Sequence, residues 1–224
     1  MGEPVDQWNG KGYRLRTFKA FNRDFEYYPE LGERTVEIPI ALAAYSGINQ
    51  DNVIEVGYVM ARQIKDRHLA HALPNRIVDL FDTTPECENI DAGLVDYTGA
   101  FVLSISTLEH MDMPDYGNTD TGRNRGVKCL IKMLNESAGY FITWPLGYNK
   151  HFDAGVMSLG VDVFMLHQNK GPTNSDPHVL PEWEQLPTPN WSIQYGSPFH
   201  YGNAVGIISN VPWIMNHEII HHCA

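Results

Sequence analysis

Residues 101–110, FVLSISTLEH, are the clearest guide to the fold of this chain. The segment begins with an aliphatic and β-branched run, becomes polar at Ser106 and Thr107, and ends in Glu109-His110. This pattern is typical of a buried parallel strand whose carboxyl end brings polar side chains into a cleft, where open α/β sheets bind their ligands. On its own the segment fits a core strand followed by an ordinary loop equally well. The flanking sequence distinguishes between a ligand-binding strand end and such a loop.

The preceding sequence predicts a strand–helix–strand unit. Residues 52–57 (NVIEVG) have a buried-strand pattern that ends in Gly57, residues 60–72 have helical spacing, and residues 76–82 (RIVDLFD) have a second strand pattern. Such βαβ units form right-handed crossovers in parallel sheets. Asp79 lies 22 positions after Gly57 (79 − 57), where an acidic residue holds the ribose of a cofactor. The signal is incomplete, because the second and third glycines of a dinucleotide fingerprint are missing.

The other segments predict the rest of the sheet. Residues 33–46 suit a short helix with Pro39 in its first turn or at a break, and residues 127–134 suit a helix capped by Gly139. Further strands are expected at 140–144, 161–167 and 204–209, with a long proline-bearing loop at 171–189.

We therefore expect one α/β domain, residues 33–210, with a Rossmann-like sheet that begins parallel and finishes with an antiparallel C-terminal strand pair. Residues 1–32 are rich in aromatic side chains and are expected to pack on this core or across its cleft. Residues 211–224 are interpreted as a C-terminal tail, so that the histidines within it are not expected to form a site.

Composition limits the class of protein. The 224 residues carry a net charge of -11, which disfavours a nucleic-acid or anionic-membrane partner. The hydrophobic content of 43% is spread evenly, without a run of membrane-spanning length or a signal peptide at Met1. The three cysteines are widely separated, which indicates reduced thiols rather than a disulfide framework or a zinc site. A cytoplasmic protein is the expectation, and the resemblance described next implies an enzyme, in a host cytoplasm if its source is viral.

Several motifs together resemble the class I S-adenosylmethionine-dependent methyltransferases, and most of all a bacterial and viral branch that modifies glycans and capsules. The matching segments run from about residue 33 to residue 209: Glu33-Arg34 with Glu37, Glu55-Val56-Gly57, Val78-Asp79, Asn89-Ile90-Asp91, Ser104 to His110, Pro145 to Asn149, Tyr195 to Pro198, and Asn203-Ala204. A narrower likeness, to the methyltransferase portion of large-virus glycosyltransferases, implies possible fusion to or association with glycosyltransferase domains.

The resemblance implies S-adenosyl-L-methionine as the cofactor. It assigns Glu55 and Gly57 to the methionine part, Asp79 to the ribose hydroxyls and Asp91 to the adenine amino group. A carboxylate suits the last two roles because it accepts two hydrogen bonds at once.

Three further positions bear on this cofactor site. Arg34 either pairs with the methionine carboxylate or forms an ion pair with Glu37, and Ser106 is placed among the cofactor-binding residues. The sequence departs from many relatives at Tyr58-Val59-Met60, where they have further glycines, and the bulk of Tyr58 would narrow the site.

Methyl transfer to an alcohol requires removal of the hydroxyl proton, so a base is needed near the acceptor. His110, just past the central strand, is the candidate, although a histidine that only orders the loop is the alternative. Glu109 is the second catalytic candidate, because it could orient His110. With Asp112 it could instead bind Mg²⁺ or Mn²⁺, but no ligand spacing demands a metal and none is favoured.

The acceptor is expected to lie against Trp144, Tyr148, Asn149 and His151. An aromatic plane beside amide groups suits a sugar, although aromatic residues at strand ends are usually core residues. The resemblance implies O-methylation of a sugar hydroxyl in a glycan, with deoxyhexoses such as rhamnose favoured. The alternatives are transfer to a phenolic or other small molecule, and a non-catalytic module that only binds the cofactor.

Overall fold

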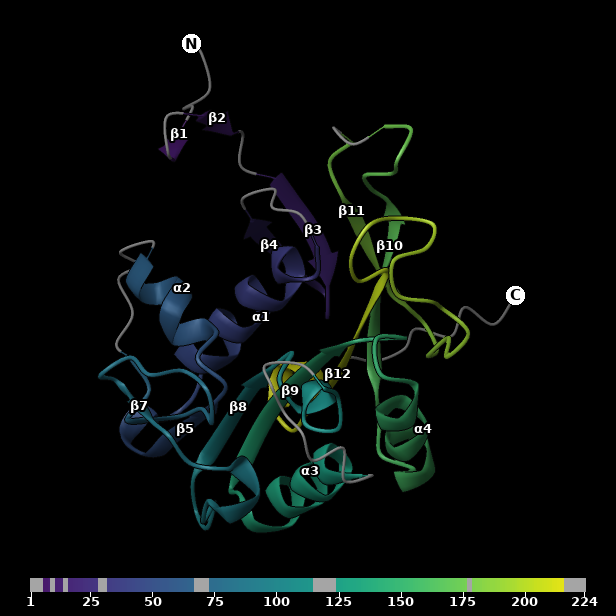
Figure 1. Ribbon diagram of the computed structural model, residues 1–224. Coiled ribbons are helices and arrows are strands. Elements are labelled where there is room, and N and C mark those ends of the chain that lie inside the picture. The colour runs from purple at the N-terminus through teal and green to yellow at the C-terminus, as the bar shows by residue number, and fades with distance from the viewer. Residues whose placement is uncertain are drawn as a thin grey trace.

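The computed structural model describes residues 6–8, 11–13, 16–27, 32–66, 73–114, 124–176 and 179–215. Its main feature is an eight-stranded sheet with the order β11-β10-β12-β9-β8-β5-β6-β7 (Figure 1). The predicted α/β class and a mostly parallel sheet are therefore confirmed.

The parallel part of the sheet contains the predicted strand–helix–strand unit. Its five strands are β5 (Val53–Val56), β6 (Arg76–Val78), β7 (Cys87–Glu88), β8 (Phe101–Ile105) and β9 (Gly139–Pro145). The strand from FVLSISTLEH, β8, lies between β5 and β9 and is buried from its second residue onward. The carboxyl ends of β5, β6 and β8 consequently meet at one edge of the sheet.

The C-terminal strands complete the sheet in an order that differs from the chain order. Strand β12 (Ala204–Ser209) lies between β9 and β10 (Phe164–Lys170) and is antiparallel to both. Strand β11 (Glu182–Leu186) pairs antiparallel with β10 at the edge. The prediction of a continuous loop at 171–189 is wrong here, because Trp183 turns into the core from an otherwise polar, loop-like segment.

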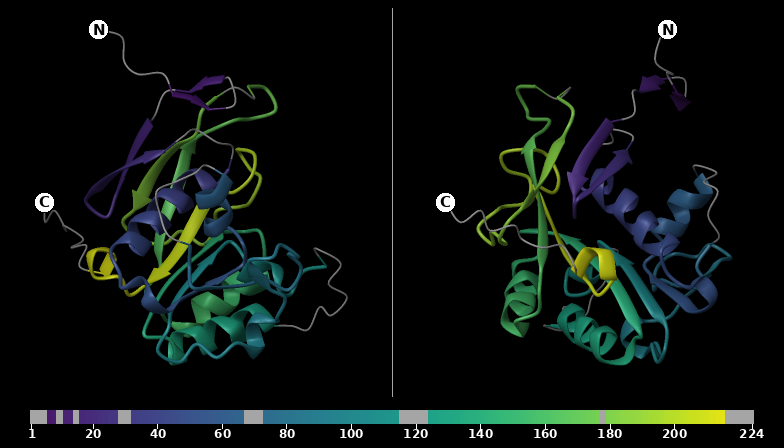
Figure 2. Two further views of the ribbon diagram at one scale, coloured as in Figure 1. Left: turned by 90° about the vertical axis from the view of Figure 1, so that its left-hand side faces the viewer. Right: turned by 180° about the vertical axis from the view of Figure 1, so that it is seen from behind.

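Helices cover both faces of the sheet (Figure 2). The larger hydrophobic core lies between one face and α1 (Arg34–Ser46) with α2 (Met60–Asp66), and the second core lies between the other face and α3 (Arg125–Glu136) with α4 (Lys150–Leu159). The short 3₁₀ turns are η1 (Gln50–Asn52), η2 (Ala92–Leu94) and η3 (Leu108–His110).

Two helix predictions need correction. Helix α1 continues through Pro39, which lies beyond the first turn. Proline removes one backbone hydrogen bond, but Val36, Ile40 and Ala44 are completely buried along the helix and hold it in place. Helix α3 ends before Gly139, which already belongs to β9. The second half of the helix predicted at 60–72 lies outside the described residues.

The β3–β4 hairpin and the first residues after β12 pack on the α1 side of the core. The N-terminal hairpins are β1 (Asp6–Trp8) with β2 (Lys11–Tyr13), and β3 (Arg16–Ala20) with β4 (Arg23–Tyr27). Phe21 is 3% exposed and packs edge-on against Phe164 and Trp213. Helix α5 (Pro212–Met215) adds the fully buried Ile214, so the beginning of the segment interpreted as a tail packs on the core. The histidines at 217, 221 and 222 lie outside the described residues.

Candidate functional site

A pocket of about 340 Å³ opens at the carboxyl ends of β5, β6 and β8. Six of the residues predicted to bind a cofactor or to act in catalysis line it: Arg34, Gly57, Asp79, Asp91, Ser106 and His110. They come from five separate segments of the chain, and the parallel strand order is what brings them together.

Gly57 forms the turn directly after β5. Its φ of +86° is in the region that favours glycine, and a Cβ built there would lie 2.1 Å from the Thr107 side-chain oxygen. Its N–H donates to the Val78 carbonyl at 2.9 Å, which ties the turn to β6. A side chain at position 57 would therefore clash with the segment that follows β8.

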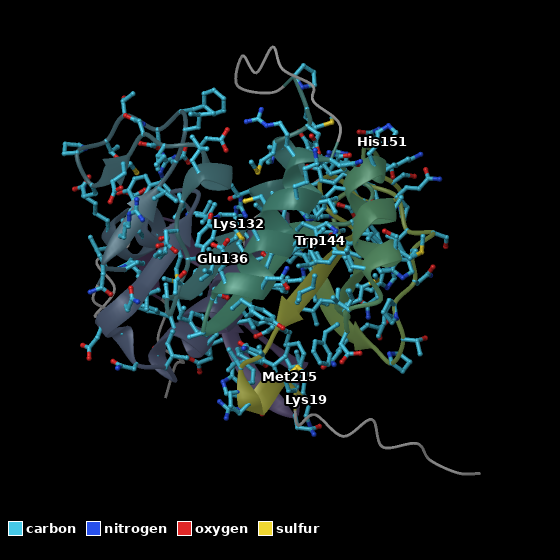
Figure 3. All side chains as sticks on the ribbon, turned by 90° about the horizontal axis from the view of Figure 1, so that it is seen from below. Lys19, Lys132, Glu136, Trp144, His151 and Met215 are labelled. Carbon is cyan, nitrogen blue, oxygen red and sulfur yellow. The ribbon has the colours of Figure 1, made fainter. Side chains whose placement is uncertain are left out.

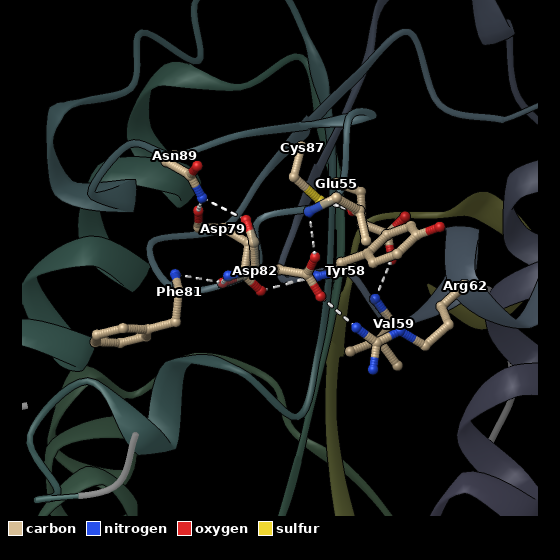
Figure 4. A network of polar contacts seen from close by, with 10 residues as sticks. Glu55, Tyr58, Val59, Arg62, Asp79, Phe81, Asp82, Cys87 and Asn89 are labelled. Atoms are coloured by element: carbon tan, nitrogen blue, oxygen red, sulfur yellow. Dashed lines mark hydrogen bonds and ion pairs between the residues drawn. The ribbon is translucent and has the colours of Figure 1, made fainter. Parts of the chain in front are cut away.

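Glu55 lies beneath the pocket rather than in its wall. The side chain is fully buried, and its carboxylate accepts a hydrogen bond from the backbone N–H of Val59 (Figure 4). It also accepts from the backbone N–H groups of Met60 and Ala61, the first two residues of α2. Burial raises the pKa of Glu55 to about 7, although these three donors favour the charged form. Glu55 is thus a buried helix cap, a position that the strand pattern did not reveal.

Tyr58 does not stand free in the pocket. Its ring belongs to a small apolar cluster with Ala61 and Ile77, next to Cys87, and the Arg62 guanidinium lies 5.0 Å from the ring centroid. The backbone N–H of Tyr58 faces the pocket side and donates to Asp79 Oδ2 at 3.1 Å. The bulk of the Tyr58 side chain is therefore accommodated mainly in the packing around β6.

Asp79 connects the loops that follow β5 and β6. Besides the bond from Tyr58, Asp79 Oδ1 accepts from the N–H groups of Phe81 at 2.9 Å and Asp82 at 3.0 Å (Figure 4). A carboxylate offers about four acceptor positions, so these three bonds leave one for a ligand in the pocket. The neighbouring Leu80 and Phe81 line the pocket and are 44% and 46% exposed.

Asp91 and Asp112 are both engaged with the start of α3. Asp91 accepts from the Gly93 N–H at 2.8 Å and forms an ion pair with the guanidinium of Arg125, which also lines the pocket. Asp112 accepts from the backbone N–H groups of Arg125 at 2.8 Å and Gly126 at 3.2 Å. The conditional metal role of Asp112 gains no support, and the described residues contain no group of three acidic, histidine or cysteine side chains placed to hold a metal ion.

Arg34 and Ser106 share a buried partner, Glu37. The Glu37 carboxylate accepts from Arg34 Nη1 at 2.8 Å, Ser106 Oγ at 2.6 Å and Thr143 Oγ1 at 2.7 Å. Burial raises the pKa of Glu37, and the charge of Arg34 opposes that shift. Of the two alternatives for Arg34, the ion pair with Glu37 is present, and the guanidinium still lines the pocket. Ser106 has a φ of +41°, a strained value typical of functional sites.

His110 joins the pocket to a group of aromatic side chains. Its ring centroid lies 4.8 Å from that of Tyr148, and the Tyr148 ring lies 5.1 Å from that of Tyr195. Behind His110, the fully buried Glu109 places Oε1 3.5 Å from His110 Nε2. The structure therefore brings three of the predicted catalytic and acceptor residues together, Glu109, His110 and Tyr148.

Of the other three predicted acceptor residues, Asn149 lies beside this group, where its Nδ2 donates to the Glu109 backbone carbonyl at 2.7 Å. Trp144 is completely buried on the α3 and α4 side of the sheet, with its indole N–H donating to Asp153 Oδ1 at 2.9 Å, whereas His151 is exposed on α4 (Figure 3). Asn149 is 3% exposed and caps α4 by accepting from the N–H groups of His151 and Phe152. Trp144 and Asn149 thus use their polar atoms in bonds to neighbouring residues, and none of these three side chains lines the pocket.

Sequence reasoning missed several pocket residues. Thr107, Leu80, Phe81 and Arg125 line the pocket but were not among the predicted ligands. Leu80 and Phe81 directly follow Asp79, so two large apolar residues after a strand-terminal acid were a usable signal. Arg125 had no such signal, because its ion pair with Asp91 depends on how α3 docks.

The pocket is lined by both polar and apolar side chains, with His110 among them, and so suits a ligand that has polar and apolar parts. Within the described residues, no helix is long and apolar enough to cross a membrane. Comparison with protein-family models and with curated protein sequences finds no match for this chain.

Proposed function

We propose that this protein transfers a methyl group from S-adenosylmethionine to a hydroxyl group, with a sugar unit of a glycan as the acceptor. The observation that carries the proposal is the grouping of Gly57, Asp79 and His110 around one pocket at the carboxyl edge of a mostly parallel sheet. That edge is where open α/β sheets bind nucleotide-like ligands.

The pocket has the parts that an adenosine derivative needs. Asp79 keeps one acceptor position for a ribose hydroxyl, and the half-exposed Leu80 and Phe81 offer apolar surface for a flat base. Arg34 supplies a positive charge for the carboxylate of a methionine moiety. The cofactor has no phosphate, which agrees with the single glycine turn at Gly57.

The reaction follows from the position of His110. The acceptor oxygen attacks the methyl carbon as the carbon–sulfur bond breaks, and the His110 imidazole takes the hydroxyl proton. Tyr148 and Tyr195 extend from His110 and would contact the acceptor, since aromatic rings suit the apolar face of a sugar. The choice of a sugar over a phenol rests on the sequence resemblance and on these rings.

The first test is calorimetric binding of S-adenosylhomocysteine. Asp79→Ala removes one charge-assisted hydrogen bond, so we expect affinity to fall about tenfold to a hundredfold, equivalent to about 1.5–3 kcal/mol. The matched control is Asp96→Ala, because Asp96 makes the same kind of turn, accepting from the Thr98 N–H at 2.9 Å, away from the pocket.

Mass spectrometry over a panel of glycosides and phenols then identifies the acceptor. Methylation of a deoxyhexoside supports the proposal, and methylation of phenols alone would replace the sugar with a phenolic acceptor. Binding without turnover on any acceptor would indicate a non-catalytic module. A folded protein that binds neither S-adenosylmethionine nor S-adenosylhomocysteine would refute the methyltransferase proposal.

A further inference from the structure

Glu109 is a buried carboxyl group without a compensating partner. Its side chain is 0% exposed, and neither carboxylate oxygen has a hydrogen-bond partner within the described part of the chain. Its backbone, in contrast, is fixed, because the Glu109 carbonyl accepts from Asn149 Nδ2 at 2.7 Å. Burial of a polar group without a partner is costly, so such a group calls for a functional explanation.

Charged and titratable groups face Glu109 from three sides. Helix α1 and the residue before it contribute two acids and one base, η3 contributes a histidine, and the loop before β12 contributes a tyrosine: Glu33, Arg34, Glu37, His110 and Tyr195. Arg34 is the only one of these groups that stays positively charged over the whole physiological pH range. Its guanidinium already forms an ion pair with Glu37 at 2.8 Å.

The surroundings therefore favour a neutral Glu109. Burial raises its pKa well above the ordinary value, and the negative charges of Glu37 and Glu33 add to this effect, whereas its own backbone N–H and the charge of Arg34 oppose it. A proton on Glu109 has one evident path to solvent. Glu109 Oε1 lies 3.5 Å from His110 Nε2, and the His110 side chain is 24% exposed and lines the pocket.

We propose that Glu109 is the internal counter-charge of the cationic methyl donor. Glu109 carries a proton in the free protein and releases it through His110 when a sulfonium ion occupies the neighbouring end of the pocket. The remaining carboxylate then stabilises that positive charge across a medium of low dielectric constant. This inference rests on the proposed function, because it requires a sulfonium ligand.

Turnover returns the proton. The acceptor oxygen forms a bond to the methyl carbon, the carbon–sulfur bond breaks with its electron pair passing to sulfur, and His110 accepts the hydroxyl proton. Once the sulfonium has become a neutral thioether, the proton passes from His110 to the Glu109 carboxylate. Glu109 thus begins and ends each cycle as a neutral acid, and no other reactant is needed.

Proton release on binding is the direct test. Calorimetry in two buffers of different ionisation enthalpy measures it for S-adenosylmethionine, which carries the sulfonium, and for S-adenosylhomocysteine, which does not. We expect the sulfonium ligand to release up to about one proton more than the thioether at neutral pH. In Glu109→Gln this difference should vanish, and the preference for S-adenosylmethionine should fall about tenfold.

The matched control is Glu184→Gln. Glu184 also lies beside a histidine, with Oε1 3.8 Å from His167 Nδ1, but its side chain is 53% exposed and belongs to the β10–β11 edge. This variant should keep the proton release of the unsubstituted protein. If both variants behave alike, the released proton does not come from Glu109 and the proposal is wrong.

A second measurement needs no variant and covers the case in which Glu109→Gln does not fold. S-adenosylmethionine binding requires loss of the Glu109 proton, so the affinity ratio of the two ligands should shift towards S-adenosylmethionine as pH rises. The affinity ratio should become constant at pH values high enough for Glu109 to be ionised in the free protein. A ratio independent of pH, with both ligands bound, overturns the counter-charge alone, whereas failure to bind either ligand overturns the methyltransferase proposal.

Discussion

At the scale of single residues, His110 offers the most direct test of chemistry, because it lines the pocket while the proposed cofactor contacts come from other side chains. His110→Ala should lower kcat by about 10²–10⁴. The affinity for S-adenosylhomocysteine should stay nearly unchanged. Single-turnover methyl transfer and calorimetry on the same protein separate the two effects, with His151→Ala on the exposed face of α4 as the control. Near-normal chemistry in His110→Ala would rule out this base.

Gly57 tests whether the pocket depends on the close approach of two loops. Gly57→Ala introduces both an unfavourable φ and a contact of 2.1 Å with Thr107 Oγ1, whereas Gly160→Ala introduces only a φ of +63° with no atom within 4 Å. We expect Gly160→Ala to cost about 1–2 kcal/mol of unfolding free energy and Gly57→Ala to cost distinctly more. Chemical denaturation measures both, and Thr107→Ala in the Gly57→Ala background should recover part of the difference. Equal costs would show that the contact is unimportant.

The sequence was a good guide to residues that end parallel strands and a poor guide to where their side chains point. Gly57, Asp79 and Ser106 line the pocket because strand ends in a parallel sheet share one edge. Trp144 and Glu55 have surroundings that the sequence did not predict, for a common reason. Each satisfies its polar atoms on a neighbouring helix, Trp144 on Asp153 of α4 and Glu55 on the N–H groups of α2, and helix docking is not encoded in strand periodicity.

At the scale of elements, the junction between β5 and α2 should respond to pH. The pKa of Glu55 is raised from 4.5 to about 7, so the folded state holds its proton more tightly than the unfolded state does. The contribution of the protonated Glu55 to the unfolding free energy is present in full below pH 4.5, the ordinary pKa of the group. It is lost as the pH rises through about 7, the pKa in the folded state. Between pH 5 and pH 8 the unfolding free energy should therefore fall by about 2–3 kcal/mol more in the natural protein than in Glu55→Gln.

The comparison with Glu55→Gln isolates this group, because Glu37 and Glu109 shift in the same direction in both proteins. A glutamine oxygen at the Oε1 position keeps the main bonds to Val59 and Met60. Denaturation at the two pH values measures the effect, and parallel pH dependences would show that Glu55 does not control it.

Elements with strong apolar patterns were predicted well, and those shaped by tertiary contacts were not. Strand β8 follows from a mostly apolar run that contains the strand-favouring Phe101, Val102 and Ile105, whereas β11 exists because it pairs with β10 and buries Trp183. The continuation of α1 through Pro39 has the same cause, since burial of one helix face outweighs a single missing hydrogen bond.

At the scale of the whole molecule, the aromatic residues that stabilise the core and those that line the pocket lie in different parts of the fold. Phe21, in the turn between β3 and β4, is 3% exposed in the core, whereas Phe81 is 46% exposed at the pocket. Phe21→Ala should cost about 3–5 kcal/mol of stability and leave affinity for S-adenosylhomocysteine unchanged in the folded protein. Phe81→Ala should weaken binding by up to about tenfold with little loss of stability. Thermal unfolding measures the stability of both variants, and calorimetry measures their affinity for S-adenosylhomocysteine. Weakened binding in folded Phe21→Ala would contradict this prediction.

The position of β12 has a consequence for how the chain is made. Strands β9 and β10 leave the ribosome well before β12, yet in the sheet they are joined only through it. Until residues 204–209 have been synthesised, the β10–β11 hairpin has no strand through which it can join the sheet next to β9. The edge of β9 is then exposed and can pair with other chains. A strand synthesised after β10 and β11 therefore closes the middle of the sheet, which makes completion of the sheet a non-local step during translation.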